Sequence, residues 1–201
     1  MKKLLITLLL IPFLGIAQTL EDLEYISPFN NDVAAIKKGN TWGFIDQAGK
    51  LIIDYRNDLV LTKTNNASYP IFSNERSLIS NKKDGIAYFG YIDKTGKTVI
   101  EPQFLNATNF NGNAAIVLKL VKEQRSGMNE LMKNVVSYHY YEVIIDKDGK
   151  TGQYLNEDPI HITLTKEKLR NRPEITSKFI SDSLISIKND TKSRTIININ
   201  E

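Results

Sequence analysis

Short apolar stretches bounded by polar turns follow one another along the chain. The first set comprises residues 32–37, 41–45 and 50–54, which are rich in aromatic and β-branched side chains. Stretches of this length and composition, with Gly and Asn between them, are typical of β-strands joined by tight turns. We therefore predict three consecutive antiparallel strands in this part of the chain.

This set of three stretches recurs. The pattern around Asp46 returns 47 residues later around Asp93 and 53 residues after that around Asp146 (93 − 46 = 47; 146 − 93 = 53). A fourth copy begins at residues 179–188 and reaches 195–198. Such recurrence indicates copies of one supersecondary unit. We predict an all-β fold of antiparallel three-stranded hairpin repeats, about three complete units plus a partial fourth. The units either stack or close like a propeller.

Each predicted hairpin turn starts with Asp and ends with Gly. An Asp carboxylate bonds to backbone two residues on, and a Gly accepts the left-handed conformation, so we expect positive φ at Gly49 and Gly96. The three acids are interpreted as structural, because one acid per unit is too dispersed for a glycosidase pair about 5 to 9.5 Å apart. Residues 146–149 resemble part of a calcium loop but lack its Glu at the twelfth position. No metal site and no cofactor are predicted. The structural turn positions are Asp46, Gly49, Asp93, Gly96, Asp146 and Gly149.

At the strand before each turn the chain resembles the WG-repeat (KWG repeat) family. The first copy, Trp42-Gly43-Phe44-Ile45-Asp46, contains the whole motif; the second has Phe89 and Gly90 at the Trp-Gly place, and the third has Glu142 and Val143. The resemblance implies a bacterial, often exported, all-β protein without an assigned activity. Trp42 is open to two interpretations, a core residue or a sugar-stacking platform. Replacement by Phe89 in the next copy favours the core.

The first 17 residues have the form of a secretory signal peptide. Lys2 and Lys3 precede the apolar residues 4–16, and Gly15 and Ala17 provide small side chains for cleavage. A membrane anchor needs about 20 apolar residues, and this run is shorter. We therefore expect a signal peptide at 1–17, a mature domain at 18–201 and no membrane span after cleavage. The expected location is periplasmic or extracellular.

Charge and cysteine content exclude some classes of function. The chain has 26 basic and 23 acidic residues. Cleavage of the signal peptide would remove Lys2 and Lys3, so the net charge of the mature chain would be 24 − 23 = +1. A near-neutral chain does not create an overall positive electrostatic potential that would attract nucleic acid, and we expect no nucleic acid as a partner. The chain has no Cys, which excludes disulfides, thiol catalysis and thiolate metal sites.

Three segments depart from the repeat. Residues 57–70 are interpreted as mostly loop, with 59–61 a brief strand, and Pro102 is expected to end the strand before it. Residues 122–141 are interpreted as an extended hairpin with Ser126-Gly127 at its tip, while a helix over 128–136 is the alternative. Residues 156–173 are predicted to be irregular, with one or two helical turns at 165–170.

We place the binding surface in the 122–141 insertion, because insertions between repeat strands add specific surfaces. It combines aromatic, arginine and methionine side chains, which recognition surfaces favour. Whether the strand around Tyr140 is exposed or covered stays open at this point. The candidate binding residues are Arg125, Met128, Met132, Tyr138, His139, Tyr140 and Tyr141.

The predicted function is a binding or protein-interaction module of the bacterial envelope, without catalytic activity. Its partner is expected to be a protein or a surface polymer. One alternative is a hydrolase of surface polymers, which requires groups such as His139, Glu142 and Asp158 to converge in one cleft. Neither His139 nor His161 lies in a Ser/His/Asp motif. The other alternative is a purely structural envelope protein.

Overall fold

The computed structural model of the chain describes residues 20–128, 134–189 and 193–199. The predicted signal peptide, 1–17, lies outside this described part. The regular elements within it are strands β1 to β17. Over the same residues no helix is long and apolar enough to cross a membrane.

The strands form five antiparallel sheets, and we number the four larger ones as units 1 to 4. Unit 1 has the order β1 (Tyr25–Ile26), β2 (Val33–Lys38), β3 (Thr41–Asp46), β4 (Leu51–Arg56). Unit 2 consists of β7 (Phe72–Ser73), β8 (Arg76–Lys83), β9 (Ile86–Ile92) and β10 (Thr98–Phe104). Between them, β5 (Thr62–Lys63) pairs with β6 (Ser68–Tyr69).

Unit 3 contains the longest strands. It consists of β11 (Ala115–Met128), β12 (Asn134–Ile145) and β13 (Thr151–Tyr154), and β14 (Ile160–Ile162) also pairs with β12. Unit 4 consists of β15 (Lys178–Phe179), β16 (Leu184–Lys188) and β17 (Arg194–Asn198). The predicted all-β fold of hairpin repeats is confirmed.

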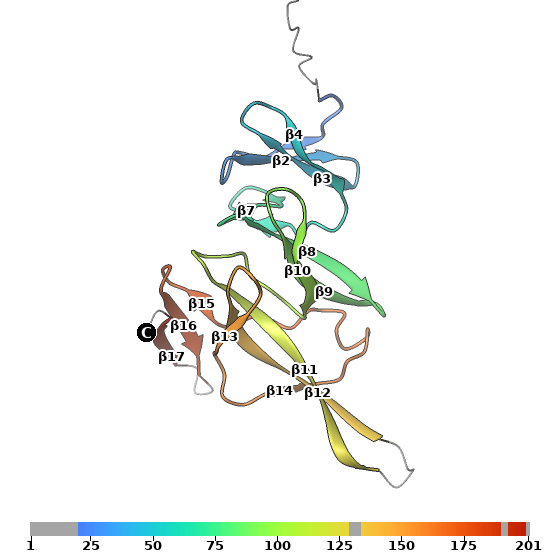
Figure 1. The fold of residues 1–201 in the computed structure, drawn as a ribbon, viewed down its shortest axis with the longest axis vertical. Helices are drawn as coiled ribbons and strands as arrows, with labels where there is room; N and C mark the ends of the chain where they lie inside the picture. The colour runs from blue at the N-terminus through green and yellow to red at the C-terminus, as the bar shows by residue number, and fades with distance from the viewer. Residues whose placement is uncertain (1–19, 129–133, 190–192, 200–201) are drawn as a thin grey trace, which may run out of the picture.

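The four units are arranged as an open stack. Figure 1 shows unit 1 at one end of the molecule, unit 2 next to it, and units 3 and 4 beyond unit 2. Units 1 and 4 lie apart in Figure 1, so over the described residues the chain adopts the stacked one of the two predicted arrangements.

The apolar core lies between successive units. Trp42 and Phe44 of β3 cluster with Ile79 of β8, while Phe89 of β9 clusters with Val143 of β12. Neighbouring residues of a strand point to opposite faces, so each central sheet packs against two neighbours. Packing between units is therefore what stabilises the stack.

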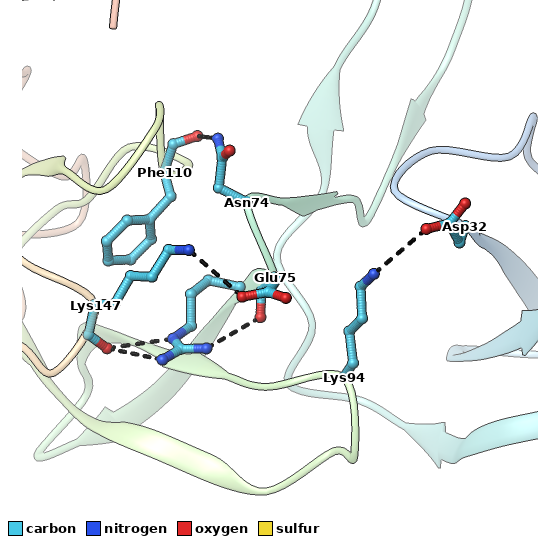
Figure 2. Close-up of polar contacts among 7 residues, drawn as sticks. Asp32, Asn74, Glu75, Lys94, Phe110 and Lys147 are labelled. Atoms are coloured by element: carbon cyan, nitrogen blue, oxygen red, sulfur yellow. Dashed lines mark hydrogen bonds and ion pairs between the residues drawn. The ribbon is translucent and has the colours of Figure 1, made fainter. Parts of the chain in front are cut away.

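Polar contacts between turns join the units along one edge. Lys94 Nζ of unit 2 lies 3.9 Å from Asp32 Oδ2 of unit 1, and Lys147 Nζ of unit 3 lies 3.4 Å from Glu75 Oε2 of unit 2 (Figure 2). Arg76 also donates to the Lys147 carbonyl at 3.1 and 3.2 Å. Exposed ion pairs contribute little stability, so these repeated contacts mainly fix how one unit sits on the next.

The three predicted turns are built alike. In each, the Asp Oδ1 accepts two backbone N–H groups at 2.8 to 3.1 Å, and the Gly N–H bonds to the Asp carbonyl. The φ angles of Gly49, Gly96 and Gly149 are 77°, 82° and 80°. The predicted hairpin register and the positive φ at Gly49 and Gly96 are confirmed. Hydrogen bonds from Thr95 and Lys97 outweigh the opposing effect of partial burial and lower the pKa of Asp93.

We expect Gly96→Val to destabilise the protein far more than Thr95→Val. A β-branched residue at a φ of 82° is strained by about 1–3 kcal/mol, and its Cβ would lie only 3.3 Å from Ile53 Cγ2. Thr95→Val removes only one exposed hydrogen bond, to Asp93. Thermal unfolding of both variants measures the difference, and equal melting temperatures would contradict this register.

Some boundaries differ from the prediction. Pro102 does not end its strand, since β10 continues to Phe104; a register shift between Ile100 and Phe104 accommodates a residue that lacks an N–H. Ser126 and Gly127 lie within β11, because pairing continues to Met128 opposite Asn134. The hairpin is thus confirmed, and the two residues predicted at its tip belong to its first strand.

Two of the irregular segments contain more structure than predicted. Residues 57–70 contain the paired strands β5 and β6, whereas the brief strand predicted at 59–61 is reduced to an isolated bridge between the buried Leu59 and Ile79. Ile160–Ile162 forms β14, whereas the predicted helical character at 165–170 is limited to one turn closed by Leu169 N–H and the Thr165 carbonyl. These short elements are stabilised by contacts with residues distant in the sequence, which the local sequence does not reveal.

Candidate functional site

The long hairpin of unit 3 extends beyond the stack. Residues 115–124 of β11 pair without interruption with 136–145 of β12, and Figure 1 shows the outer part of this hairpin projecting from the molecule. β13 and β14 pair with different parts of β12 along the edge opposite β11. The result is one sheet built around β12.

One face of β12 carries Tyr138 and Tyr140. Tyr140 is buried in a cluster with Ile86, Leu118 and Leu169, whereas Tyr138 is half-buried. Burial first, and the nearby Glu142 carboxylate second, raise the pKa of Tyr140. This face is therefore largely covered where it meets the stack.

The other face carries a row of aromatic rings across three strands. Ring centroids lie 6.0 Å apart for His161 and His139, 5.6 Å for His139 and Tyr141, and 5.0 Å for Tyr141 and Tyr154, all edge to face. Lys119 lies at the Tyr154 end of the row, with its Nζ 5.6 Å from the centroid of the Tyr154 ring. We call these five residues the aromatic row. His139 is buried, Tyr141 and Lys119 are half-buried, and His161 and Tyr154 are exposed.

A cleft adjoins the row where β14 meets the outer part of β12. It encloses about 460 Å³ and is lined by Val136–Tyr138 of β12 and by His161–Leu164. The lining combines a phenol, an imidazole, hydroxyl groups and apolar side chains. Such a mixture suits a partner that offers both apolar and hydrogen-bonding groups.

The predicted binding residues are thus only partly brought together. Tyr141 and His139 belong to the aromatic row, Tyr138 lines the cleft, and Tyr140 is part of the core. The side chains of Arg125 and Met128, and Met132 as a whole, lie outside the described residues.

Tyr154 and β14 were not predicted from the sequence as parts of this surface. The apolar-polar-apolar order Ile160-His161-Ile162 was the available strand signal. Lys119 was also missed, because its contact with Tyr154 joins β11 to β13 across the sheet.

Glu142 is a buried structural clamp. Its Oε1 accepts the Thr176 N–H at 2.6 Å and the Thr176 hydroxyl at 3.0 Å, and its Oε2 accepts the Ser177 N–H at 3.1 Å. The side chain is 4% exposed and lies on the face of β12 opposite His139. Asp158 is exposed on another segment. The three candidate hydrolase groups therefore do not converge.

We expect Glu142→Ala to lower the free energy of unfolding by about 1–3 kcal/mol. Truncation leaves the partly buried Thr176 N–H and the buried Ser177 N–H without an acceptor, which carries this cost. The matched control is Glu157→Ala, because Glu157 is exposed. Urea unfolding of the two variants gives the difference; equal midpoints would mean that the clamp contributes nothing.

A second cleft, of about 600 Å³, lies between β9 and residues 169–174. The Arg172 guanidinium lies 5.4 Å from the centroid of the Phe89 ring, which is itself buried. Arg170 and Arg172 line this cleft and are exposed to solvent. Phe89, which occupies the position of the motif Trp, is part of the apolar core. The position is structural, as predicted.

Trp42 is also a core residue. Its side chain is 8% exposed and packs in the cluster between units 1 and 2, with the Tyr25 ring edge-on at 5.8 Å. A sugar-stacking platform needs an open ring face, and this ring has none. The core interpretation of Trp42 is confirmed.

The comparisons agree with this geometry. The sequence model of a family described as WG containing repeat matches residues 22–42, 42–56 and 89–119. The resemblance to the WG-repeat family is confirmed over these segments. Comparison with curated proteins and with solved structures gives no match.

Proposed function

We propose that the protein is an interaction module of the bacterial envelope that binds a protein or a surface polymer through the aromatic row. The WG-repeat stack provides a rigid support, and the row lies on the sheet that departs most from the repeat. Tyrosine supplies a large contact area with a polar tip, which is why it is enriched in recognition surfaces.

One observation carries the proposal. Four aromatic rings from three strands line up edge to face on a sheet whose outer part extends beyond the stack, with Tyr154 47% exposed at one end. Single exposed aromatics are common on protein surfaces, whereas an ordered row of rings with a lysine supports a contact surface. The separation of Glu142 from His139 supports a role in binding without catalysis.

The test compares variants of the row with a remote aromatic control. The full chain is immobilised and exposed to an envelope fraction and to purified surface polysaccharides, and the affinity for what is retained is then measured. We expect Tyr154→Ala and Lys119→Ala to weaken that affinity about tenfold or more, as for residues central to an interface.

The control is Phe29→Ala, because Phe29 is 50% exposed but lies in unit 1. It is expected to bind like the unchanged chain. Equal affinity of all variants, with melting temperatures unchanged, would contradict a binding surface at the row.

Export is part of the proposal, because envelope partners are met only outside the cytoplasm. The basic, apolar and small-residue regions of 1–17 support it. Mass spectrometry of protein recovered from the periplasm or medium is expected to give an N-terminus at Gln18. Recovery of cytoplasmic protein that retains Met1 would contradict export.

A further inference from the structure

The only two histidines of the chain are direct partners in the unit 3 sheet. They lie 22 residues apart in sequence (161 − 139 = 22), and the β12–β14 register places His139 opposite His161. Directly opposed residues share one face of a sheet, with Cβ atoms about 4.5–5.5 Å apart. The two rings are accordingly close, with centroids 6.0 Å apart at an angle of 73°.

One of these histidines has an unpaired polar atom. His139 is 7% exposed, and its Nδ1 is buried without a hydrogen-bond partner among the described residues. A buried ring nitrogen of this kind needs a partner, which in proteins is a polar group, a water molecule or an ion. Because His161 faces the same side and is exposed, an ion can reach the pair from solvent.

We propose that His139 and His161 form a binding site for a divalent transition metal ion of the Zn²⁺, Ni²⁺ and Cu²⁺ class. Imidazole is a preferred ligand of these ions, with metal–nitrogen distances of about 2.0–2.1 Å, so the two nitrogens must lie within about 4 Å of each other. The ring centroids are 6.0 Å apart, and rotation of the exposed His161 side chain is expected to bring one of its nitrogens closer to the His139 ring.

The site leaves coordination positions free. The described residues contain no preassembled group of three His, Cys, Asp or Glu ligands. Glu123 is opposite Ser137 on the same face, diagonal to His139, and its Oε2 accepts the Ser137 hydroxyl at 3.4 Å. Diagonal neighbours about 7–8 Å apart are within reach of long side chains. In the proposed site the Glu123 side chain would have to move to become a third ligand, and water would fill the remaining positions.

This site was not predicted from the sequence, because neither histidine lies in a metal-ligand motif. The short strand β14 brings them together. The inference is independent of the proposed function, since metal binding is measured on the purified chain without any partner.

The test is calorimetric titration of the full chain without a histidine tag. We expect one Cu²⁺, Ni²⁺ or Zn²⁺ ion per chain, with Cu²⁺ bound most tightly, and no binding of Mg²⁺, which prefers oxygen ligands.

His161→Asn is the decisive variant, because His161 is exposed and its loss leaves the core intact. We expect it to weaken Zn²⁺ binding at least tenfold with an unchanged melting temperature of the metal-free protein, and Glu123→Gln to weaken binding less. Absence of saturable binding by the unchanged chain would overturn the proposal. So would equal affinity of His161→Asn and the unchanged chain, which would show that the ion is bound elsewhere.

Discussion

Trp42→Ala is expected to lower the free energy of unfolding by about 3–5 kcal/mol, which is the usual cost of truncating a buried large aromatic side chain. For a chain of this size the melting temperature would fall by roughly 6–20 °C. The physical reason is the position of Trp42 in one apolar cluster with Phe72 and Ile79 of unit 2 and with residues of its own sheet. Its loss leaves a cavity at a junction of two units.

The control for this variant is Phe29→Ala, whose side chain is 50% exposed. We expect that change to stay within about 0.5 kcal/mol of the unchanged chain, as surface substitutions do. Chemical denaturation monitored by circular dichroism measures both. If Trp42→Ala melted like the unchanged chain but lost a ligand, the ring would be a binding platform.

Gly90→Ala is expected to be similarly damaging, by about 3 kcal/mol, although it adds a single methyl group. A Cβ at Gly90 would lie 2.3 Å from the Ile100 carbonyl oxygen and 2.7 Å from Pro102 N. Both are backbone atoms of β10, where the register shift brings the strand over β9. They cannot move aside without breaking the ladder, so the upper end of overpacking costs applies.

Two glycines provide a graded comparison. At Gly43, the equivalent position of unit 1, a Cβ would meet the Ile53 carbonyl at 2.9 Å, so Gly43→Ala is expected to cost less than Gly90→Ala. At Gly152 in β13 the nearest contact would be 3.7 Å, so Gly152→Ala is expected to be nearly neutral. Equal unfolding midpoints for the three variants would show that β10 yields and that no close approach constrains the motif.

The packing of the Trp side chain and the close approach of backbone to the Gly together explain the Trp-Gly pair in physical terms. The aromatic side chain fills the space toward the next unit, and the missing Cβ lets the third strand pass over the second. Unit 3 lacks this glycine. Val143 stands at the glycine place and is fully buried in the core, beside a shorter third strand, β13.

The aromatic place of unit 3 is also changed. Glu142 stands there, and what approaches it is the backbone of residues 176–177, which offers N–H groups in need of an acceptor. A carboxylate satisfies them where an indole ring would not. The departure of the third copy from the motif therefore has a structural cause.

The sequence by itself determined the repeat. The alternation of apolar stretches with Asp-x-x-Gly turns specifies short antiparallel hairpins, because side-chain period and turn chemistry are local properties. The structural roles of Asp46, Asp93 and Asp146, and the positive φ of Gly49 and Gly96, followed from this information alone.

Only the tertiary structure decided how the candidate surface is composed. Tyr138, His139, Tyr140 and Tyr141 are contiguous in sequence, yet one enters the core and two join a row with His161 and Tyr154. That division depends on β14, a three-residue strand within a segment that lacks a repeat pattern. The energy that places such a strand comes from pairing with a distant partner, which local sequence does not encode.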